Sequence, residues 1–220
     1  MVTSIDFGDF RRVTPFARDF GYGRGQPVDR YYIEQFLAEH AGDIRGHVLE
    51  IGDDRYTRQF GEGCVVHSDV LDLPREDARA TITADLTAAD DLTGGQFDCI
   101  IFTQTLQFIY DLEPALYNLH RLLRPRGVLL GSFPVISQIC RFDMDRWGDY
   151  WRFTTASVYR LLATPFGTEQ VAVRSYGNVL AATCLLYGLA AADLEPGELD
   201  YHDPDYQVLI TARAIRLGNP

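Results

Sequence analysis

The sequence predicts an α/β protein with a doubly wound, mainly parallel sheet. Short strand-like segments alternate with helical patterns along most of the 220 residues, and this alternation is typical of βαβ units. The first strand-like segment, residues 47–51, ends at Gly52, and many nucleotide-binding folds place a cofactor loop at such a break. A hydrophobic share of 46% supplies enough apolar side chains for a core.

Ahead of the first strand, the pattern predicts an arm and then a helix. Residues 1–27 mix glycines with aromatic side chains and look irregular. Glycines allow hinging and aromatic rings can cover a ligand, so we expect this arm to act as a lid. Residues 28–40 place apolar side chains at helical spacing and predict a helix. We expect residues 28–220 to form a single domain.

The alternation of strands and helices continues to the end of the chain. Strands are predicted at residues 47–51, 64–68, 80–83, 97–103, 127–133, 170–175 and 206–214. Further helices are predicted at residues 56–60, 112–123, 155–163 and 179–192. A helix and a long loop join the last two strands, which is compatible with a terminal strand inserted beside its predecessor.

The charge composition indicates which classes of molecule this protein binds. The 20 basic residues, all of them arginine, stand against 31 acidic residues, and the net charge is −11. This acidic balance disfavours nucleic acid, because its backbone is bound through cationic side chains. The absence of lysine excludes a Schiff-base enzyme and a Walker-type phosphate lysine. We therefore expect a small-molecule partner, and a homodimer stays open.

The apolar segments and the cysteines indicate where in the cell the protein is located and whether it has a disulfide or a metal site. No run approaches the roughly 18 apolar residues of a membrane span, and residues 1–18 lack an apolar signal segment. We therefore expect a soluble, cytoplasmic protein with no membrane partner. The four cysteines lie far apart, with no pair at the close spacing typical of zinc sites. For this reason neither a disulfide nor a metal site is expected.

Several segments carry a resemblance to a known family. They read "HVLEIG", "VVHSDVLDLP", "ITADLTAADDLTGGQFDCIIFTQTLQFIYDLEPALYNLHRLLRPRGVLLGSFP" and "WGDYWRFTTASVYRLL". In this order they resemble class I S-adenosylmethionine-dependent methyltransferases, especially the small ones that accompany glycosyltransferases and natural-product or surface-polysaccharide pathways. The resemblance covers residues 45–165. It implies a Rossmann-like sheet of seven strands with an antiparallel last strand, and S-adenosylmethionine as cofactor.

The resemblance also implies cofactor-binding residues near the carboxyl ends of the strands, where open α/β sheets bind ligands. They are Glu50, Gly52, Asp53, Asp54, Tyr56, Asp69, Asp85, Leu86, Thr103 and Gln104. Gly52 would let the backbone approach the cofactor closely. Asp69, placed just beyond the second strand, would accept hydrogen bonds from the ribose hydroxyls. Asp85 and Leu86 would flank the adenine, and residues 103–104 would line the methionine end.

The loop after Gly52 departs from the family. Asp54 and Tyr56 stand where the family has further glycines. Asp53 and Asp54 would repel the pyrophosphate of a dinucleotide, whereas the sulfonium and ammonium groups of S-adenosylmethionine tolerate or favour nearby acids. NAD and FAD are therefore disfavoured. In the alternative interpretation, the two acids are turn formers that cap the next helix.

Residues 140–154, after the fifth strand, combine two tryptophans with three acids and three arginines. Aromatic walls with a few charged groups suit a sugar or another polyhydroxylated acceptor, so this segment is predicted to form the acceptor pocket. The predicted substrate-binding residues are Gln107, Trp147, Trp151 and Arg152. The candidates for a catalytic base are Asp143, Asp149 and His67.

These features predict methyl transfer from S-adenosylmethionine to an oxygen or nitrogen of a small, sugar-containing or natural-product acceptor. Two alternatives stay open. The altered loop could mark a methyltransferase-like fold that now catalyses a cyclisation, elimination or hydrolysis, or the chain could be a non-catalytic partner of a biosynthetic enzyme. Asp69 and Asp85 argue for continued nucleoside binding, and the lack of two glycines argues against it.

Overall fold

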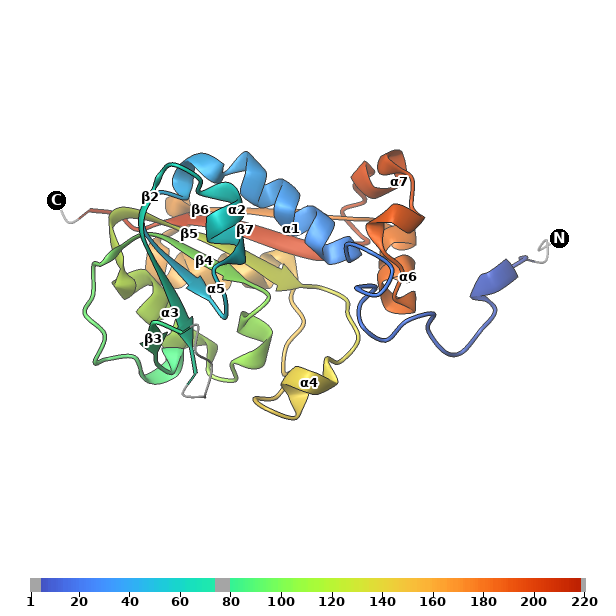
Figure 1. Ribbon diagram of the computed structural model, residues 1–220, viewed down its shortest axis with the longest axis horizontal. Coiled ribbons are helices and arrows are strands. Elements are labelled where there is room, and N and C mark those ends of the chain that lie inside the picture. Colours follow the sequence, from blue (N-terminus) through green and yellow to red (C-terminus); the bar gives the residue numbers. More distant parts are fainter. Residues whose placement is uncertain (1–4, 74–79, 219–220) are drawn as a thin grey trace.

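The computed structural model of the protein describes residues 5–73 and 80–218. In this part of the chain seven strands form one sheet, in the order β3-β2-β1-β4-β5-β7-β6 (Figure 1). The strands are β1 (Gly46–Ile51), β2 (Val65–Asp72), β3 (Ile82–Thr83), β4 (Phe97–Thr103), β5 (Leu123–Pro134), β6 (Val171–Tyr176) and β7 (Leu209–Ile215). Strands β1 to β5 pair in parallel, and β7 lies antiparallel between β5 and β6. The predicted sheet, mostly parallel with an antiparallel last strand, is confirmed.

Helices cover both faces of the sheet. They are α1 (Val28–Glu39), α2 (Arg55–Phe60), α3 (Leu112–Leu122), α4 (Arg141–Met144), α5 (Thr155–Phe166), α6 (Val179–Tyr187) and α7 (Pro196–Asp200). One hydrophobic core joins Val48 to α1 and α6, and a second joins Leu49 to α3 and α5, because successive strand residues point to opposite faces (Figure 1). The predicted doubly wound arrangement is confirmed. None of these helices is long and apolar enough to cross a membrane.

The helices differ from the sequence pattern at the end of α6 and in two short helices. Helix α6 ends at Tyr187, not at residue 192, because Gly188 adopts a left-handed φ of 72° and ends the helix. The short helix α7 was not predicted, although it begins with Pro196, a residue suited to the first helical position. The short helix α4 was not predicted either, and it lies in the segment expected to contact the acceptor.

The second strand is longer than the pattern predicts, and this moves one candidate residue. The prediction ends at residue 68, whereas β2 continues to Asp72. It continues because its last two residues pair with β3. Asp69 therefore lies inside the strand, opposite Leu49 of β1, and the prediction that it follows the strand is wrong.

The described part of the predicted arm packs on the C-terminal part of the chain. The first four residues lie outside the described residues. In Figure 1 the chain near the N-terminus extends away from the sheet, past α6. The rings of Phe10 and Phe16 pack against Tyr187 of α6, at centroid distances of 5.1 and 5.7 Å. Arg24 forms a bidentate ion pair with Asp193. These contacts anchor the arm.

A glycine of this arm serves close packing. Gly21 has a φ of 94°, and a Cβ at this position would lie 2.5 Å from the carbonyl oxygen of Leu189. Only glycine fits this approach of two backbones without a shift. The sequence suggests that the glycines of the arm allow hinging. Gly21 instead allows close packing.

Candidate active site

A cavity of about 690 Å³ opens where β1, β2 and β4 end; we call it the strand-end cavity. Its volume lies within the roughly 300–1,000 Å³ typical of ligand sites. Strand β1 lies between β2 and β4, so the chain order of the strands reverses at this place. Open α/β sheets bind their ligands at such a switch point.

The loop between β1 and α2 forms one wall of this cavity. Gly52 has a φ of 87°, a conformation that favours glycine, and a Cβ built there would meet only open space. Asp53 also lines the cavity, while its Oδ1 accepts a hydrogen bond from the backbone N–H of Arg55 at 3.0 Å. Asp54 points elsewhere and pairs with Arg58 at 3.0 Å. Both acids shape the turn, and only Asp53 faces the cavity.

Glu50 holds this loop in place. Its side chain is buried and accepts hydrogen bonds from the backbone N–H groups of Tyr56 (3.1 Å) and Thr57 (2.7 Å) and from the Thr57 hydroxyl (2.8 Å). The carboxylate thereby caps the first turn of α2, where backbone N–H groups lack helical partners. Burial raises the pKa of Glu50 to about 7, and the hydrogen bonds from Thr57 and Tyr56 counteract part of that rise.

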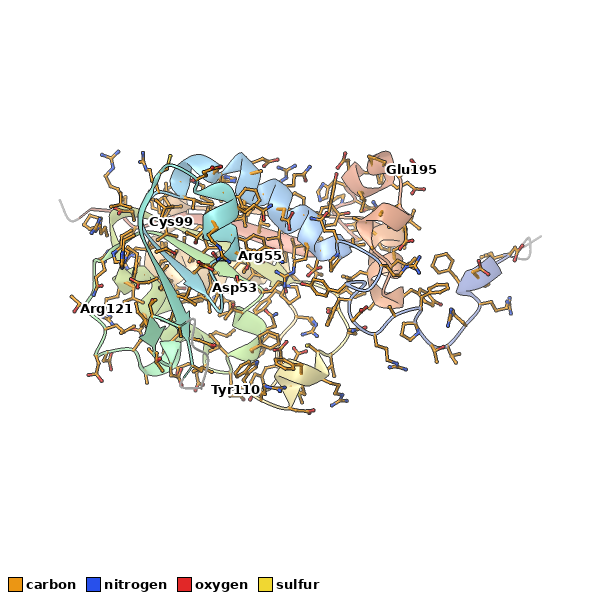
Figure 2. The ribbon with its side chains drawn as sticks, viewed as in Figure 1. Asp53, Arg55, Cys99, Tyr110, Arg121 and Glu195 are labelled. Carbon is orange, nitrogen blue, oxygen red and sulfur yellow. The ribbon has the colours of Figure 1, made fainter. Side chains whose placement is uncertain are left out.

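Two arginines surround Tyr56 at the same wall. The Tyr56 hydroxyl accepts hydrogen bonds from Arg55 Nη2 at 2.8 Å and from Arg30 Nη1 at 3.3 Å. The Arg55 guanidinium also lies 4.6 Å from the centre of the Tyr56 ring. The bulky ring is buried here and forms part of the cavity wall. In Figure 2 Asp53 and Arg55 lie together beside the end of β1, and Tyr110 lies below them, near α4.

The acid that faces the cavity from β2 is Asp72, the last residue of the strand. Asp69 lies three residues earlier and does not line the cavity. Its Oδ2 is 2.6 Å from His47 Nε2, and its Oδ1 accepts a hydrogen bond from the Thr81 hydroxyl at 2.6 Å. Burial acts to raise the pKa of Asp69, but the hydrogen bonds from Thr81 and His47 lower it overall. Of these two acids, Asp72 lines the strand-end cavity.

His67 also lies outside the cavity. Its side chain is 64% exposed, and its Nε2 is 3.4 Å from Asp69 Oδ2. Strand β2 directs both residues to the same face, because they are two positions apart. The placement of His67 does not support a role as catalytic base.

The remaining predicted cofactor residues lie on the cavity wall. They are Asp85, Leu86, Thr103 and Gln104. The Oδ1 atom of Asp85 accepts hydrogen bonds from the backbone N–H and the hydroxyl of Thr87, both at 2.8 Å, which fixes the turn after β3. Gln104 has a φ of 48°, and its backbone N–H donates to the Ser132 carbonyl at 3.1 Å. Such strained backbone clusters at functional sites.

A second cavity, of about 370 Å³, adjoins the first; we call it the adjoining cavity. Gln104 and Asp143 line both cavities, and so does Tyr22 of the N-terminal arm. The predicted acceptor residue Gln107 lines the adjoining cavity. Its Nε2 donates to the Gln104 carbonyl at 3.0 Å, while its buried Oε1 has no hydrogen-bond partner among the described residues.

Asp149 and Arg152 line the adjoining cavity as an ion pair. The two carboxylate oxygens of Asp149 accept from Arg152 Nη1 at 2.5 Å and from Nη2 at 3.0 Å. The Asp149 side chain is only 2% exposed. With both oxygens bound to a guanidinium, this carboxylate is poorly placed to take a proton, so the geometry favours a structural role.

The two tryptophans of residues 140–154 have different positions. Trp147 lines the strand-end cavity and donates from Nε1 to Asp143 Oδ1 at 3.2 Å. Trp151 lines neither cavity; it packs on a hydrophobic core and donates from Nε1 to the Ile109 carbonyl at 3.0 Å. Its expected role as a substrate-binding residue stays a prediction. A nearby tyrosine ring, Tyr150, lines the strand-end cavity in its place.

Comparison with protein-family models matches residues 18–131 to a methyltransferase domain. This segment is more than half of the chain and contains β1, β2 and β4, the strands that bound the strand-end cavity. The chain belongs to the methyltransferase-domain family. Comparison with curated proteins finds no match.

Solved structures share the fold of this methyltransferase. The N-methyltransferase NodS from Bradyrhizobium japonicum, in complex with S-adenosyl-L-homocysteine, has 18% identity, a TM-score of 0.53 and coverage of 91% of this chain and 93% of that chain. The 1,6-didemethyltoxoflavin-N1-methyltransferase from Burkholderia thailandensis has 16% identity, a TM-score of 0.55 and coverage of 90% and 81%. The [4+2]-cyclase SpnF has 13% identity, a TM-score of 0.57 and coverage of 90% and 84%. At these identities the likeness shows the fold alone.

The cofactor of the methyltransferase is S-adenosylmethionine, and the strand-end cavity fits this molecule. Asp72 and Asp85 offer acceptor oxygens for hydroxyl and amine groups, and Arg30 and Arg55 offer cationic donors for a carboxylate. The open space beside Gly52 leaves room for close approach to the loop. A cofactor with both cationic groups and a carboxylate matches this mixed wall.

The sequence did not predict Asp72, Arg30 or Arg55 as residues of the site. Asp72 stands before a Leu-Pro pair, which can mark a strand end, but Asp69 comes first in the same segment. Arg30 lies in the first turn of the predicted helix at residues 28–40, where the helical pattern of apolar side chains gives no sign of a binding role. Its proximity to Tyr56 depends on the packing of α1 against α2, which the pattern of either helix alone does not reveal.

Proposed function

We propose that this methyltransferase transfers a methyl group from S-adenosylmethionine to an oxygen or nitrogen of a polyhydroxylated small molecule, which binds in the adjoining cavity. The observation that carries this proposal is the shared wall: Gln104 and Asp143 line both cavities. A cofactor in one cavity and an acceptor in the other would meet there. Positioning of this kind supplies a large part of the rate of a two-substrate reaction.

The residues of the strand-end cavity take distinct roles in this proposal. Asp72 accepts hydrogen bonds from the ribose hydroxyls, and Asp85 accepts one from the adenine amine. Arg30 binds the carboxylate of the amino-acid end. When bound, S-adenosylmethionine supplies a methyl group on an electron-poor sulfonium. Glu50 keeps the loop of Gly52 in the conformation that admits the cofactor, because its carboxylate accepts hydrogen bonds from the first turn of α2.

The adjoining cavity suits an acceptor with several hydroxyl groups. Asp29, Arg30 and Gln107 line it, so donors and acceptors are both available. The buried Oε1 of Gln107, which lacks a partner among the described residues, suits a hydroxyl donor on the acceptor. A hydroxyl that satisfies a buried polar atom contributes strongly to discrimination, because an analogue without it leaves that atom unpaired. Tyr22 extends the wall, and we propose that the arm is an anchored cover.

Asp143 is the proposed base where the acceptor must lose a proton. It lines both cavities, so its carboxylate lies beside the place of transfer. Its Oδ1 accepts a hydrogen bond from Trp147 Nε1, which orients the group. Asp149, by contrast, is bound on both oxygens by Arg152. General bases must reach the proton that they remove, and this requirement favours Asp143.

The test uses a metabolite extract of the source organism and S-adenosylmethionine with a deuterated methyl group. Wild-type protein should transfer the label to a polyhydroxylated product. Asp143→Asn should lower turnover by roughly 10²–10⁴, with S-adenosylhomocysteine binding close to that of the wild type. Asp145→Asn is the matched control, because Asp145 is an exposed acid of the same segment that lines neither cavity. Equal turnover in both variants would remove Asp143 from the reaction.

A second candidate is a reaction without methyl transfer. It is favoured by the loop, in which Asp54 and Tyr56 replace the glycines usual in the family. The fold is also compatible with such chemistry, since one protein of similar fold is described as a [4+2]-cyclase. The same extract separates the candidates: a product that forms with no methyl donor present would overturn methyl transfer and support the second candidate.

A further inference from the structure

Two histidines and one aspartate meet on β1 and β2, outside both cavities; we call them the His-Asp cluster. They are His47 of β1 and His67 and Asp69 of β2. His47 is the register partner of His67, and Asp69 is two positions beyond His67. Alternate residues of a strand point to one face, and paired residues of neighbouring strands share a face. The sheet therefore gathers the three side chains.

The distances in the His-Asp cluster are those of a metal-ligand set. One ligand atom from each residue lies within 4.8 Å of the other two. His67 Nε2 is 3.4 Å from Asp69 Oδ2. Ligand atoms about 2.0–2.1 Å from a tetrahedral ion lie about 3.3 Å from each other. The 2.6 Å between His47 Nε2 and Asp69 Oδ2 is a hydrogen bond, which would open by roughly 0.7 Å around an ion.

Neighbouring groups hold the ligands in position. The Thr81 hydroxyl donates to Asp69 Oδ1 at 2.6 Å and leaves Oδ2 toward the imidazoles. The His47 ring packs against Phe97 at a centroid distance of 4.6 Å. Such outer contacts are characteristic of metal sites, because they orient the ligands before the ion arrives. His67 is mostly exposed, so an ion can enter from solvent and retain water.

We propose that His47, His67 and Asp69 bind one divalent transition-metal ion, with Zn²⁺ as the best fit. Two imidazoles, one carboxylate and a water complete a tetrahedral set, and this mixture of nitrogen and oxygen ligands suits zinc. The site is separate from the proposed methyl transfer, since none of the three residues lines either cavity. It would join β1 to β2, the strand that ends at Asp72.

The His-Asp cluster cannot be recognised as a local sequence motif. His47 and His67 are separated by twenty positions, and only the pairing of β1 with β2 brings them together. The sequence expectation of no metal site considered the spacing of cysteines, and none of the ligands proposed here is a cysteine. Strand register, which a single sequence does not specify, is the information that reveals the cluster.

The test is a calorimetric titration of Zn²⁺ into full-length protein without an affinity tag, after removal of metals by a chelator. We expect one ion per chain with micromolar or tighter affinity. His67→Ala and Asp69→Asn should each weaken binding by at least about tenfold. His202→Ala is the matched control and should bind as the wild type does, because His202 contacts Ser175 and lies outside the cluster.

Two further measurements sharpen the result. Cys64→Ser should leave zinc binding unchanged; this variant is needed because Cys64 is an exposed thiol just before β2. Co²⁺, used as a second probe, should give the visible absorption of a tetrahedral site, and His67→Ala should abolish it. Because His67 is mostly exposed, its replacement spares the fold and decides the matter even if Asp69→Asn unfolds.

Three outcomes would overturn the proposal. They are the absence of saturable Zn²⁺ binding in the wild type, binding by His67→Ala that equals the wild type, and loss of binding in Cys64→Ser.

Discussion

Asp69 and Asp72 lie three residues apart on β2, and this interval places them in different surroundings. Residues an odd number of positions apart point to opposite faces, and Asp72 also ends the strand. Asp69 contacts His47 and Thr81, whereas Asp72 lines the strand-end cavity. A sequence segment with two acids identifies the strand end only to within a few positions. Here the pairing of residues 71–72 with β3 extends the strand, so that Asp72 and not Asp69 lies at its end.

The first prediction compares these two acids. Asp72→Asn should weaken S-adenosylhomocysteine binding by about 1.5–3 kcal/mol, the contribution of hydrogen bonds to a charged group. Asp69→Asn should change the affinity much less, because Asp69 does not line the cavity. Calorimetry on both variants measures the difference. A large loss in Asp69→Asn with none in Asp72→Asn would restore the ribose role to Asp69.

The second prediction concerns Arg30, which we propose as the partner of the cofactor carboxylate. Arg30→Met should weaken S-adenosylhomocysteine by about tenfold or more, as expected for loss of a charge-assisted hydrogen bond. It should affect 5′-methylthioadenosine little, because that ligand lacks the amino-acid end. Arg58→Met is the control, since Arg58 is exposed, pairs with Asp54 and does not line the strand-end cavity. Equal losses for both ligands would mean that Arg30 supports the loop and not the carboxylate.

The third prediction concerns pH and Glu50. Burial raises the pKa of Glu50 to about 7 in the folded protein, from an ordinary value of 4.5. The folded state therefore holds this proton more tightly than the unfolded chain. The resulting stabilisation is complete below about pH 4.5 and is lost as the pH rises through about 7.

Glu50→Gln cannot titrate, so it isolates this effect. Relative to the variant, the wild type should lose free energy of unfolding between about pH 5 and about pH 8. Denaturant unfolding of both proteins at several pH values measures this change. A difference between wild type and variant that stays constant over this range would place the pKa of Glu50 near its ordinary value.

At the scale of elements, the order and type of the seven strands and of five helices followed from the sequence, whereas α4, α7 and several ends did not. Apolar periodicity located the strands because each buries side chains on one or both faces. The end of β2 depended on pairing with β3, and the end of α6 on the left-handed Gly188. The role of Gly21 depended on its approach to Leu189, a contact between distant parts of the chain.

The fourth prediction concerns Arg126, at an irregularity in the pairing of β5 with β4. Arg126 has a φ of 70°, a left-handed conformation that favours glycine. A left-handed conformation costs a residue with a Cβ about 1–2 kcal/mol. Arg126→Gly should therefore raise the free energy of unfolding by up to about 1 kcal/mol, after the greater chain entropy of glycine is subtracted.

Arg126→Ala is the matched control. It removes the exposed side chain but keeps the Cβ, so it should bring no such gain. Urea unfolding measures all three proteins. Equal stabilisation by alanine and glycine would show that the arginine side chain, and not the backbone conformation, is the source of the effect.

At the scale of the whole molecule, distant segments meet at one edge of the sheet. The ends of β1, β2 and β4 meet there because parallel strands direct their carboxyl ends to the same side. Tyr22 of the arm and Asp143 of α4 line the same two cavities, although they are far apart in sequence. The arm reaches this place because it is tied to the C-terminal part through Arg24 and Asp193.

The parallel sheet explains which residues of the site could be predicted from the sequence. Residues immediately after strands, such as Gly52 and Gln104, were found because topology alone brings them to the edge. The surroundings of Trp151 and Asp149 were not predictable from the sequence, because they are set by packing on a core and by pairing with Arg152. Composition identifies a segment rich in aromatic and charged side chains, but it does not tell which of them face a ligand.

The central claim is that the strand-end cavity binds S-adenosylmethionine and not a dinucleotide. Calorimetric titration of the purified protein with S-adenosylhomocysteine, and separately with NAD⁺, tests this claim most directly. We predict one S-adenosylhomocysteine per chain, with an affinity in the micromolar range, and no binding of NAD⁺. Binding of NAD⁺ at the same site, or no heat from S-adenosylhomocysteine at millimolar concentration, would contradict the account.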